Sequence, residues 1–189
     1  MYRNYCWLLL LLACASQGAT PKDEWIRTLQ DISANPSREM ALTEQESSWN
    51  PFAKSPYATG LRQFTDSTGE WLSRTHCRHL GPYRPLNADW SLRCGVIYAE
   101  WQETRTPDDW CYCDRRIVAE MLYNAGYWVM WEMKYSNNTL MGAKELCGKE
   151  VMPNGRKRSM QSCIENYSYP EHISIRQTKY IYYGGRRCR

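Results

Sequence analysis

The sequence predicts a mainly helical fold, and three observations support this. Apolar residues recur every three or four positions in several segments, which is the period of an amphipathic helix. Residues that cap or break helices separate those segments. A strand-like alternation of β-branched and aromatic residues is confined to residues 173–183. We therefore expect packed helices, with a small hairpin near the C-terminus.

The first predicted helix covers residues 23–34 and places four apolar side chains on one face, namely Trp25, Ile26, Leu29 and Ile32. A second helix runs from a cap at Ser37 to Ser47, because the residue before Pro51 avoids helical angles. Glu46 is then close to the C-terminal end of that helix. There the negative end of the helix dipole disfavours a carboxylate and should raise its pKa, as a general acid requires.

Three further helices are expected after a loop rich in Ser, Pro and Gly at residues 51–60. One covers residues 65–75. The next covers residues 88–103 and has one apolar face, formed by Trp90, Cys94, Ile97, Tyr98 and Trp101. The third is capped by Asp114 and continues to residue 129, with an interruption or bend at Gly126.

Residues 1–19 form a predicted export signal, with an apolar run at residues 6–15 that is shorter than the ~20 residues a membrane span needs. Ala13-Cys14-Ala15 fits the small-residue rule for cleavage of such a signal. In a second interpretation, Cys14 is a lipoprotein processing site and carries lipid. The soluble form is favoured because Leu12 fits that site poorly. Either way, the mature chain is expected outside the cytoplasm, in the periplasm, secreted, or on the outer membrane as a lipoprotein.

Seven cysteines follow this signal: Cys77, Cys94, Cys111, Cys113, Cys147, Cys163 and Cys188. In an oxidising compartment they are expected to form disulfides, with one thiol left over and the pairing undetermined. The Cys111-Tyr112-Cys113 spacing is too short for a zinc knuckle, and the chain has only three His. We predict no metal site and no cofactor.

The composition restricts the function further. With 24 Lys and Arg against 20 Asp and Glu, the net charge of +4 weakly favours an anionic polymer as partner. Nucleic acid is not expected, because no helix concentrates basic residues. Nine Trp and fourteen Tyr accompany only two Phe. Such rings can stack on sugars, or can fill a core while their N–H and O–H groups find partners.

Three short blocks follow one another along the chain. They supply an acid, a turn with an amide side chain, and a phenol: Glu46-Ser47-Ser48-Trp49-Asn50-Pro51, Gly60-Leu61-Arg62-Gln63 and Tyr123-Asn124-Ala125-Gly126. In this order they resemble the soluble lytic transglycosylases and their goose-lysozyme-like relatives. The resemblance covers roughly residues 37–131. It implies a lysozyme-like helical domain, which we place at residues 20–144. Residues 145–189 lie outside the resemblance, and their cysteines indicate a disulfide-braced C-terminal extension.

The resemblance implies that the protein cleaves the MurNAc-β-1,4-GlcNAc bond of peptidoglycan without consuming water. Glu46 is the predicted catalytic residue, first as general acid toward the leaving oxygen. The substrate's own N-acetyl group assists at the anomeric carbon. Glu46 then acts as base on the 6-hydroxyl, which closes a 1,6-anhydroMurNAc ring.

The substrate-binding residues implied by the resemblance are Ser47, Gln63, Tyr123 and Asn124. Ser47 and Gln63 are expected to hydrogen-bond the sugar, Tyr123 to reach Glu46, and Asn124 to help form the cleft. Each has a structural alternative. The Ser47 hydroxyl can bond its own helix backbone, Gln63 can be solvated, and Tyr123 and Asn124 can be a core tyrosine and a capping asparagine.

Two features bear on the details of this site. Arg62 stands where the family usually has Met, and a cleft-lining arginine would alter local substrate contacts. If Asp66, Glu70 or Glu100 faced Glu46, a second carboxylate could activate water and the outcome would be hydrolysis.

Three functional hypotheses follow. The first is an exported lytic transglycosylase that serves a secretion machine, a phage or wall turnover. The second is a hydrolytic muramidase of the same fold, and the third is a non-catalytic cell-wall-binding or assembly protein. The expected partners are peptidoglycan glycan strands and a secretion or phage assembly complex. No nucleic acid and no transmembrane segment is expected, and Cys14 remains the site of the alternative lipid anchor.

Overall fold

A computed structural model describes residues 20–137, 139–149 and 157–188. The predicted export signal with Cys14, and the predicted turn at residues 153–155, lie outside the described residues. In the described part, helices are joined by loops, without strands. The elements are α1 (Pro21–Ile32), α2 (Pro36–Ser47), α3 (Asp66–Arg74), η1 (Arg78–Leu80), α4 (Ala88–Glu103), α5 (Tyr112–Ala125), α6 (Tyr127–Tyr135), α7 (Leu140–Leu146), α8 (Met160–Gln177) and η2 (Thr178–Tyr183). The prediction of a mainly helical fold is confirmed.

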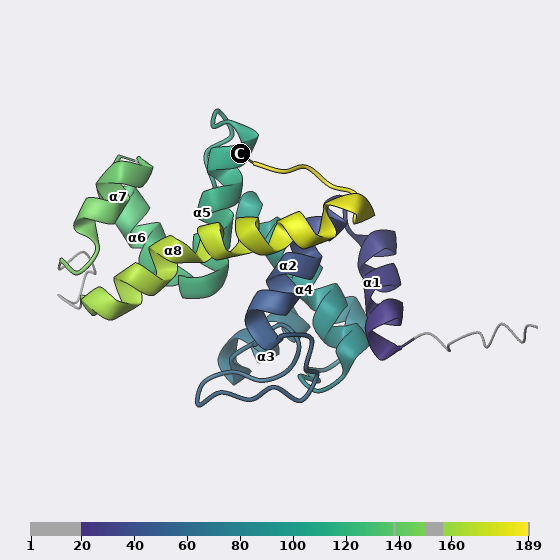
Figure 1. Ribbon diagram of the computed structural model, residues 1–189. Helices are drawn as coiled ribbons and strands as arrows, with labels where there is room; N and C mark the ends of the chain where they lie inside the picture. Colours follow the sequence, from purple (N-terminus) through teal and green to yellow (C-terminus); the bar gives the residue numbers. More distant parts are fainter. Residues whose placement is uncertain (1–19, 138, 150–156, 189) are drawn as a thin grey trace, which may run out of the picture.

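The long helix α8 runs across the molecule, from the side of α6 and α7 to the side of α1, as Figure 1 shows. It packs against α2 and α5, while α4 packs against α1 and α5. The loop at residues 51–64 lies beyond the C-terminal end of α2. Helix α2 is therefore enclosed by segments that are far apart in the sequence.

Buried apolar side chains form three clusters. The first joins α1, α2, α4 and α8, through residues that include Leu29, Met40, Leu42, Leu92, Val96 and Ile173. The second lies between α3 and α4 and contains Phe64, Leu72, Trp90 and Tyr98. The third joins α5, α6 and α7 through Val118, Met121, Leu122, Val129, Met133 and Ala143. The first and second clusters meet at Tyr123.

The predicted helices are present, but two of their caps differ from the prediction. Helix α2 is capped by Asn35, whose side chain accepts the N–H of Arg38 at 3.4 Å, and not by Ser37. Pro36 explains this shift, because proline favours the first helical position and so makes the preceding residue the cap. Helix α5 begins after Cys111, ahead of the predicted cap at Asp114.

Gly126 divides the predicted helix at residues 114–129 into two. Its φ of 56° lies in the left-handed region, where glycine carries no Cβ penalty. Helix α5 ends at Ala125 and α6 begins at Tyr127. The interruption predicted at this glycine is therefore a complete break.

The small hairpin predicted at residues 173–183 is wrong. This segment forms the end of α8 and the 3-10 helix η2. Buried residues follow one another at helical intervals along α8, and they are Cys163, Asn166, Tyr169, Pro170, Ile173 and Gln177. Packing of this face on the core outweighs the β-propensity of single Ile and Tyr residues, which depends strongly on context.

Three disulfides form, and they leave the exposed Cys111 as the free thiol among the described residues. Cys77 is joined to Cys94, Cys147 to Cys163, and Cys113 to Cys188. The last of these ties the end of the chain to the first turn of α5. The expectation of disulfides with one leftover cysteine is confirmed.

The described residues include no helix with both the length and the apolar character needed to cross a lipid bilayer.

Candidate active site

Glu46 is the penultimate residue of α2, as the sequence predicts. The helix ends there because Ser48 and Trp49 both adopt left-handed backbone angles, with φ of 51° and 66°. Ser48 closes the helix by donating its N–H to the carbonyl of Glu44 at 2.9 Å. Two consecutive non-glycine residues in this region store backbone strain, which is typical of functional sites.

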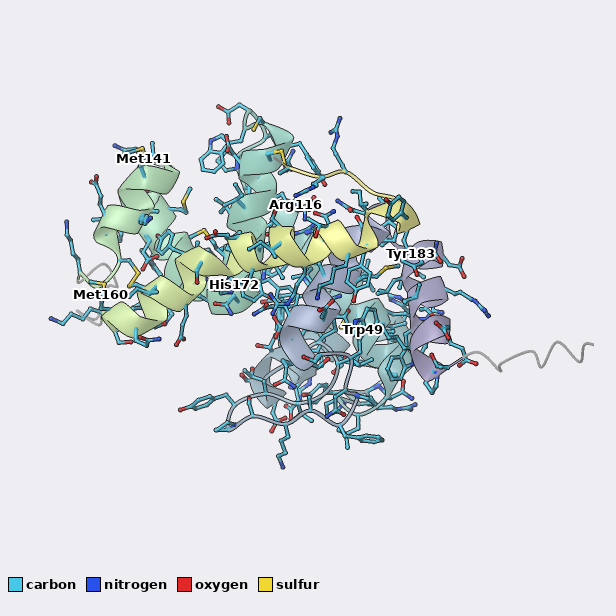
Figure 2. The ribbon with its side chains drawn as sticks, viewed as in Figure 1. Trp49, Arg116, Met141, Met160, His172 and Tyr183 are labelled. Atoms are coloured by element: carbon cyan, nitrogen blue, oxygen red, sulfur yellow. A yellow bond between two sulfur atoms is a disulfide. The ribbon has the colours of Figure 1, made fainter. Side chains whose placement is uncertain are left out.

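Trp49 holds this turn in place. Its indole is buried and donates a hydrogen bond from Nε1 to the hydroxyl of Tyr180 at 2.9 Å. Figure 2 shows Trp49 near the end of α2, below α8. The Tyr180 hydroxyl in turn donates to the carboxylate of Glu44. The strained turn that follows Glu46 is thus fixed to the C-terminal part of the chain.

The carboxyl group of Glu46 has a pKa raised to about 7. Burial is the main cause, since it disfavours the charged form. A hydrogen bond from Tyr169 and the charge of Arg62 oppose this shift. Near neutral pH the group therefore exchanges between acid and carboxylate. The sequence predicted a raised pKa from the helix dipole, whereas burial accounts for it in the structure.

Tyr169, on α8, is the hydrogen-bond partner of Glu46 that the sequence did not reveal. Its buried hydroxyl donates a hydrogen bond to Oε1 of Glu46. Burial, followed by the nearby Glu46 charge, holds the pKa of this phenol well above its ordinary value. Tyr169 therefore stays a neutral donor. It lies outside the three sequence blocks, and only the helical spacing of apolar residues around it was available as a signal.

Tyr123, on α5, is hydrogen-bonded to Arg62 and lies within reach of the Glu46 charge. Its hydroxyl donates to the backbone carbonyl of Arg62 at 3.1 Å and accepts from Nε of that arginine at 3.2 Å. Burial raises the pKa of Tyr123, and the nearby Glu46 carboxylate raises it further. Tyr123 therefore shares the electrostatic environment of Glu46, while Tyr169 makes the hydrogen bond to the acid.

Arg62 does not line a cleft. Its side chain is completely buried and forms an ion pair with Glu39, with Nη1 and Oε2 2.8 Å apart. It also donates to the carbonyl of Gly95 at 3.2 Å. Burial alone would lower its pKa, but Tyr123 and Glu39 more than offset this, so the guanidinium stays charged. Arg62, which stands where the family usually has methionine, therefore contacts Tyr123 from within the core.

Gln63 and Asn124 line one pocket together with Tyr123. The pocket has a volume of about 300 Å³, and its other lining residues are Phe64, Thr65, Thr68, Tyr98, Ala125 and Gly126. Gln63 has a φ of 46° and donates from Nε2 to the carbonyls of Gly60 and Ala53 at 2.9 and 3.1 Å. These bonds orient the amide and leave its oxygen free to accept a bond from a ligand. Asn124 is exposed at the rim and accepts a bond from Asn166 on α8.

Gly60 allows the turn that carries Gln63. Its φ is 86°, and a Cβ at this position would lie 1.9 Å from the carbonyl oxygen of Pro85. A side chain here would displace the loop.

Ser47 is half-buried next to Glu46, and its hydroxyl donates to the carbonyl of Thr43 at 3.1 Å. It does not line the pocket that contains Gln63. Its hydroxyl oxygen can still accept a bond from a ligand.

The three other acidic residues considered from the sequence have different surroundings. Asp66 interacts with Tyr83, and Glu70 pairs with Arg74 at 3.2 Å. Glu100 lies at a separate pocket beside Glu103, where burial is the first cause of its raised pKa. Among the described residues, the side chains that act on the pKa of Glu46 are Tyr169, through a hydrogen bond, and Arg62, through its charge, and neither is a carboxylate.

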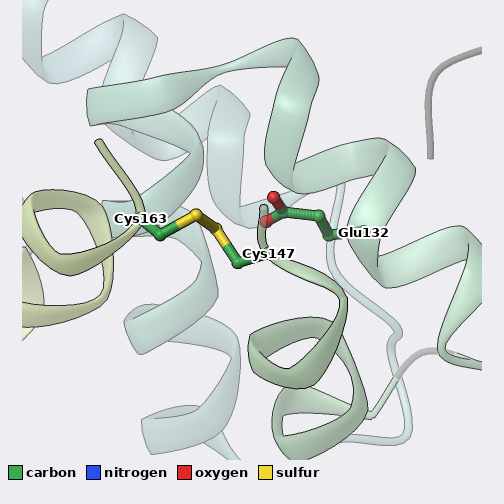
Figure 3. Close-up of side chains that lie close together, drawn as sticks. All are labelled: Glu132, Cys147 and Cys163. Carbon is green, nitrogen blue, oxygen red and sulfur yellow. A yellow bond between two sulfur atoms is a disulfide. The ribbon is translucent and has the colours of Figure 1, made fainter. Parts of the chain in front are cut away.

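One group of side chains has the composition of a metal site: Glu132, Cys147 and Cys163. Figure 3 shows the two sulfur atoms bonded to each other. Oxidised cysteines provide no thiolate ligands. Glu132 is also engaged, because it accepts a hydrogen bond from Tyr167 and lies 3.6 Å from Arg158. This group is therefore a structural disulfide beside a buried ion pair.

Residues 23–145 match the family model described as the transglycosylase SLT domain. The chain is also similar to membrane-bound lytic murein transglycosylase F from Vibrio cholerae, with 35% identity over 94 residues, which is 50% of this chain and 16% of the relative. The protein of the same name from Pseudoalteromonas translucida is 36% identical over 87 residues, covering 46% of this chain and 17% of the relative.

That from Saccharophagus degradans is 37% identical over 86 residues, covering 46% of this chain and 16% of the relative. The chain thus spans about a sixth of the length of these relatives. The family model, by contrast, matches more than half of the chain, including Glu46, Gln63 and Tyr123. The chain therefore belongs to the transglycosylase SLT domain family.

Proposed function

We propose that this protein is an exported lytic transglycosylase that cleaves the glycan strands of peptidoglycan. The observation that carries the proposal is the environment of Glu46, a half-buried acid that accepts a hydrogen bond from Tyr169 and has a pKa of about 7. A general acid works best when its pKa is close to the working pH. The neighbouring Tyr123 lines a pocket with Gln63 and Asn124, and this pocket would hold the sugar.

The first step is proton transfer from the Glu46 carboxyl group to the glycosidic oxygen. As the C1–O bond of MurNAc breaks, the oxygen of the substrate's N-acetyl group bonds to C1. Tyr169 donates to Glu46 and so stabilises the carboxylate that this step produces. Gln63, whose amide nitrogen is already occupied, offers its oxygen to the sugar.

The second step uses the same residue as a base. The Glu46 carboxylate takes the proton of the MurNAc 6-hydroxyl, O6 bonds to C1, and the bond between C1 and the N-acetyl oxygen breaks. The product is 1,6-anhydroMurNAc, and Glu46 is protonated again. Because its pKa is near neutral, one group can give and then take a proton at the same pH.

The alternative is hydrolysis by a muramidase of the same fold. That reaction usually requires a second carboxylate to act on water or on the sugar. The positions of Asp66, Glu70 and Glu100, which have other partners or surroundings, favour the lyase.

Export is part of the proposal. Residues 1–19 have the sequence of a signal peptide, and three disulfides suit an oxidising compartment such as the periplasm. A secretion or phage assembly complex would be the partner that requires local opening of the wall.

Digestion of purified peptidoglycan tests the reaction. Mass spectrometry of the products should find anhydro-muropeptides. Reducing ends alone would establish the muramidase, and binding without cleavage would establish the non-catalytic protein.

Glu46→Gln tests the catalytic assignment. The loss of proton transfer should lower the cleavage rate by at least about 100-fold without lowering the melting temperature. Glu44→Gln, in the same turn of α2, is the matched control and should remain active. Lytic activity that survives in Glu46→Gln would disprove the assignment.

A further inference from the structure

We infer that a row of aromatic rings, formed by Tyr98, Trp101, Trp71 and His76, is a second sugar-binding surface that extends the glycan site away from Glu46. This inference rests on the proposed function, because it concerns the same polymer. We call these four residues the aromatic row.

The aromatic row begins at the pocket. Tyr98 lines the pocket and lies 5.1 Å from Tyr123, measured between ring centroids. Trp101 stacks on Tyr98, with centroids 5.9 Å apart and planes inclined by 23°. Trp71 then lies 5.1 Å from Trp101, and both contact His76. The rings therefore form a continuous series of contacts from Tyr123 in the pocket to Trp71 at the protein surface.

The row becomes more exposed along its length. Tyr98 is 8% exposed, Trp101 is half-buried, and Trp71 is 39% exposed. Tyr98 belongs to the second core cluster and Trp101 packs against it, whereas Trp71 is not part of that cluster. Here the exposed indole continues a series of contacts that begins in the pocket. Aromatic rings with a polar edge suit sugars, which present C–H groups on one face and hydroxyls at their rim.

The backbone holds the row rigidly. Cys94, Tyr98 and Trp101 share one face of α4, at spacings of four and three residues. The disulfide from Cys94 to Cys77 fixes the segment that carries His76 against that face. Rings that are ordered before binding lose little conformational entropy when a ligand stacks on them.

A cation lies beside the row and suggests the kind of sugar. The guanidinium of Arg105 is 4.6 Å from the centroid of the Trp101 ring. It donates to the side-chain oxygen of Gln102, which is neutral. The lactyl and stem-peptide carboxylates of MurNAc could pair with this cation, whereas a neutral GlcNAc polymer offers no such group. The row is therefore suited to an anionic glycan.

The test measures binding in the inactive Glu46→Gln background, so that no cleavage occurs. The probes are peptidoglycan glycan strands sorted by length, and a tetrasaccharide. Trp71→Ala should weaken binding of long strands about tenfold and leave the tetrasaccharide unaffected. Trp71→Phe should restore most of the affinity. Tyr182→Ala, which removes a 96% exposed ring on η2, is the matched control and should change neither.

Unchanged binding of long strands by Trp71→Ala would overturn the inference. An equal loss for the long strands and the tetrasaccharide would also overturn it, since the effect would then not depend on length. A melting temperature equal to that of the parent shows that Trp71→Ala folds.

Arg105→Gln tests the charge preference in the same background. It should reduce the preference for MurNAc-containing strands over chitin oligosaccharides of equal length. An unchanged preference would disprove the role of this cation. Failure of the proposed function would look different, because the cleavage assay with Glu46→Gln does not depend on Trp71 or Arg105.

Discussion

The two ends of α2 hold their glutamates in different surroundings, since Glu39 is buried and Glu46 is half-buried. Glu39, in the first turn, is paired with the buried guanidinium of Arg62 and is part of the structure that supports the site. Glu46, two turns later, has a phenol as its hydrogen-bond partner, and burial raises its pKa to about 7. A cation neutralises a carboxylate, whereas a neutral donor leaves it free to titrate. The hydrogen-bond partner therefore differs at the two ends of the helix, a buried cation for Glu39 and a phenol for Glu46.

The largest effect on stability is expected when Arg62, the partner of Glu39, loses its positive charge. Arg62→Met leaves the Glu39 carboxylate buried without a counter-charge, and this should lower the free energy of unfolding by about 3–5 kcal/mol. Denaturant unfolding measures it. The double variant with Glu39→Gln should recover part of the loss. Arg74→Met, which breaks an exposed ion pair with Glu70, should cost less than about 1 kcal/mol. An equal cost for both arginine variants would contradict the comparison.

At the reactive end, removal of the charge should stabilise the protein. The pKa of Glu46 is raised in the folded state. Wild type therefore loses no folding stability through this group below the ordinary pKa of 4.5, and it loses progressively more as the pH rises to about 7. Glu46→Gln should therefore gain about 1–3 kcal/mol over wild type on going from pH 4 to pH 8. Thermal unfolding at the two pH values measures this. Glu39→Gln should instead destabilise, because Arg62 loses its partner. A pH-independent difference for Glu46→Gln would contradict the raised pKa.

The pH dependence of the cleavage rate should change when the hydrogen bond from Tyr169 to Glu46 is removed. In wild type the rate should fall above pH 7, where the acid loses its proton. Tyr169→Phe removes a hydrogen bond that lowers this pKa, so the fall should move to higher pH, by about one unit. The control is Tyr167→Phe. Tyr167 lies on α8, like Tyr169, but donates its bond to Glu132, so its loss should leave the pH profile unchanged. A shift to lower pH in Tyr169→Phe would contradict the assigned role.

The smallest effect is expected at Glu44, a half-buried residue between Glu39 and Glu46 in the sequence. It pairs with Lys179, whose side chain is 59% exposed. Burial opposes the shift, but bonds from Lys179 and Tyr180 lower the pKa of Glu44, so its contribution is present above pH 4.5 and is lost as the pH falls. Glu44→Gln should cost less than about 1 kcal/mol at pH 7, and less still in high salt. A loss as large as that of Arg62→Met would contradict this ranking.

Local patterns in the sequence identified most of the helices and the position of Glu46. The helix at residues 88–103 matches α4, because its apolar spacing and its cap are both local features. Proline at residue 51 and the polar turn before it likewise placed Glu46 at a helix end. These features depend on neighbours within a few residues, which a sequence displays directly.

The partners of Glu46 could not be found in this way. Tyr169 lies 123 residues further along the chain, and it reaches the acid only because α8 packs across α2. Pro170, inside α8, also obscured the helix, since proline normally interrupts one. The sequence showed Arg62 in place of the family's usual methionine, and a cleft-lining arginine there would have altered the substrate contacts. The sequence contains no sign that the buried Glu39 draws this arginine into the core instead.

The place of Tyr169 in the chain affects how activity arises during synthesis. Ribosomes produce the N-terminal helices first, so Glu46 emerges long before the phenol that bonds to it and before Tyr180, which fixes the turn after it. Until α8 has docked, the acid lacks its hydrogen bond from Tyr169. A polypeptide released early would possess the glutamate yet lack the surroundings that make it a proton donor, and only the finished molecule would be able to cut.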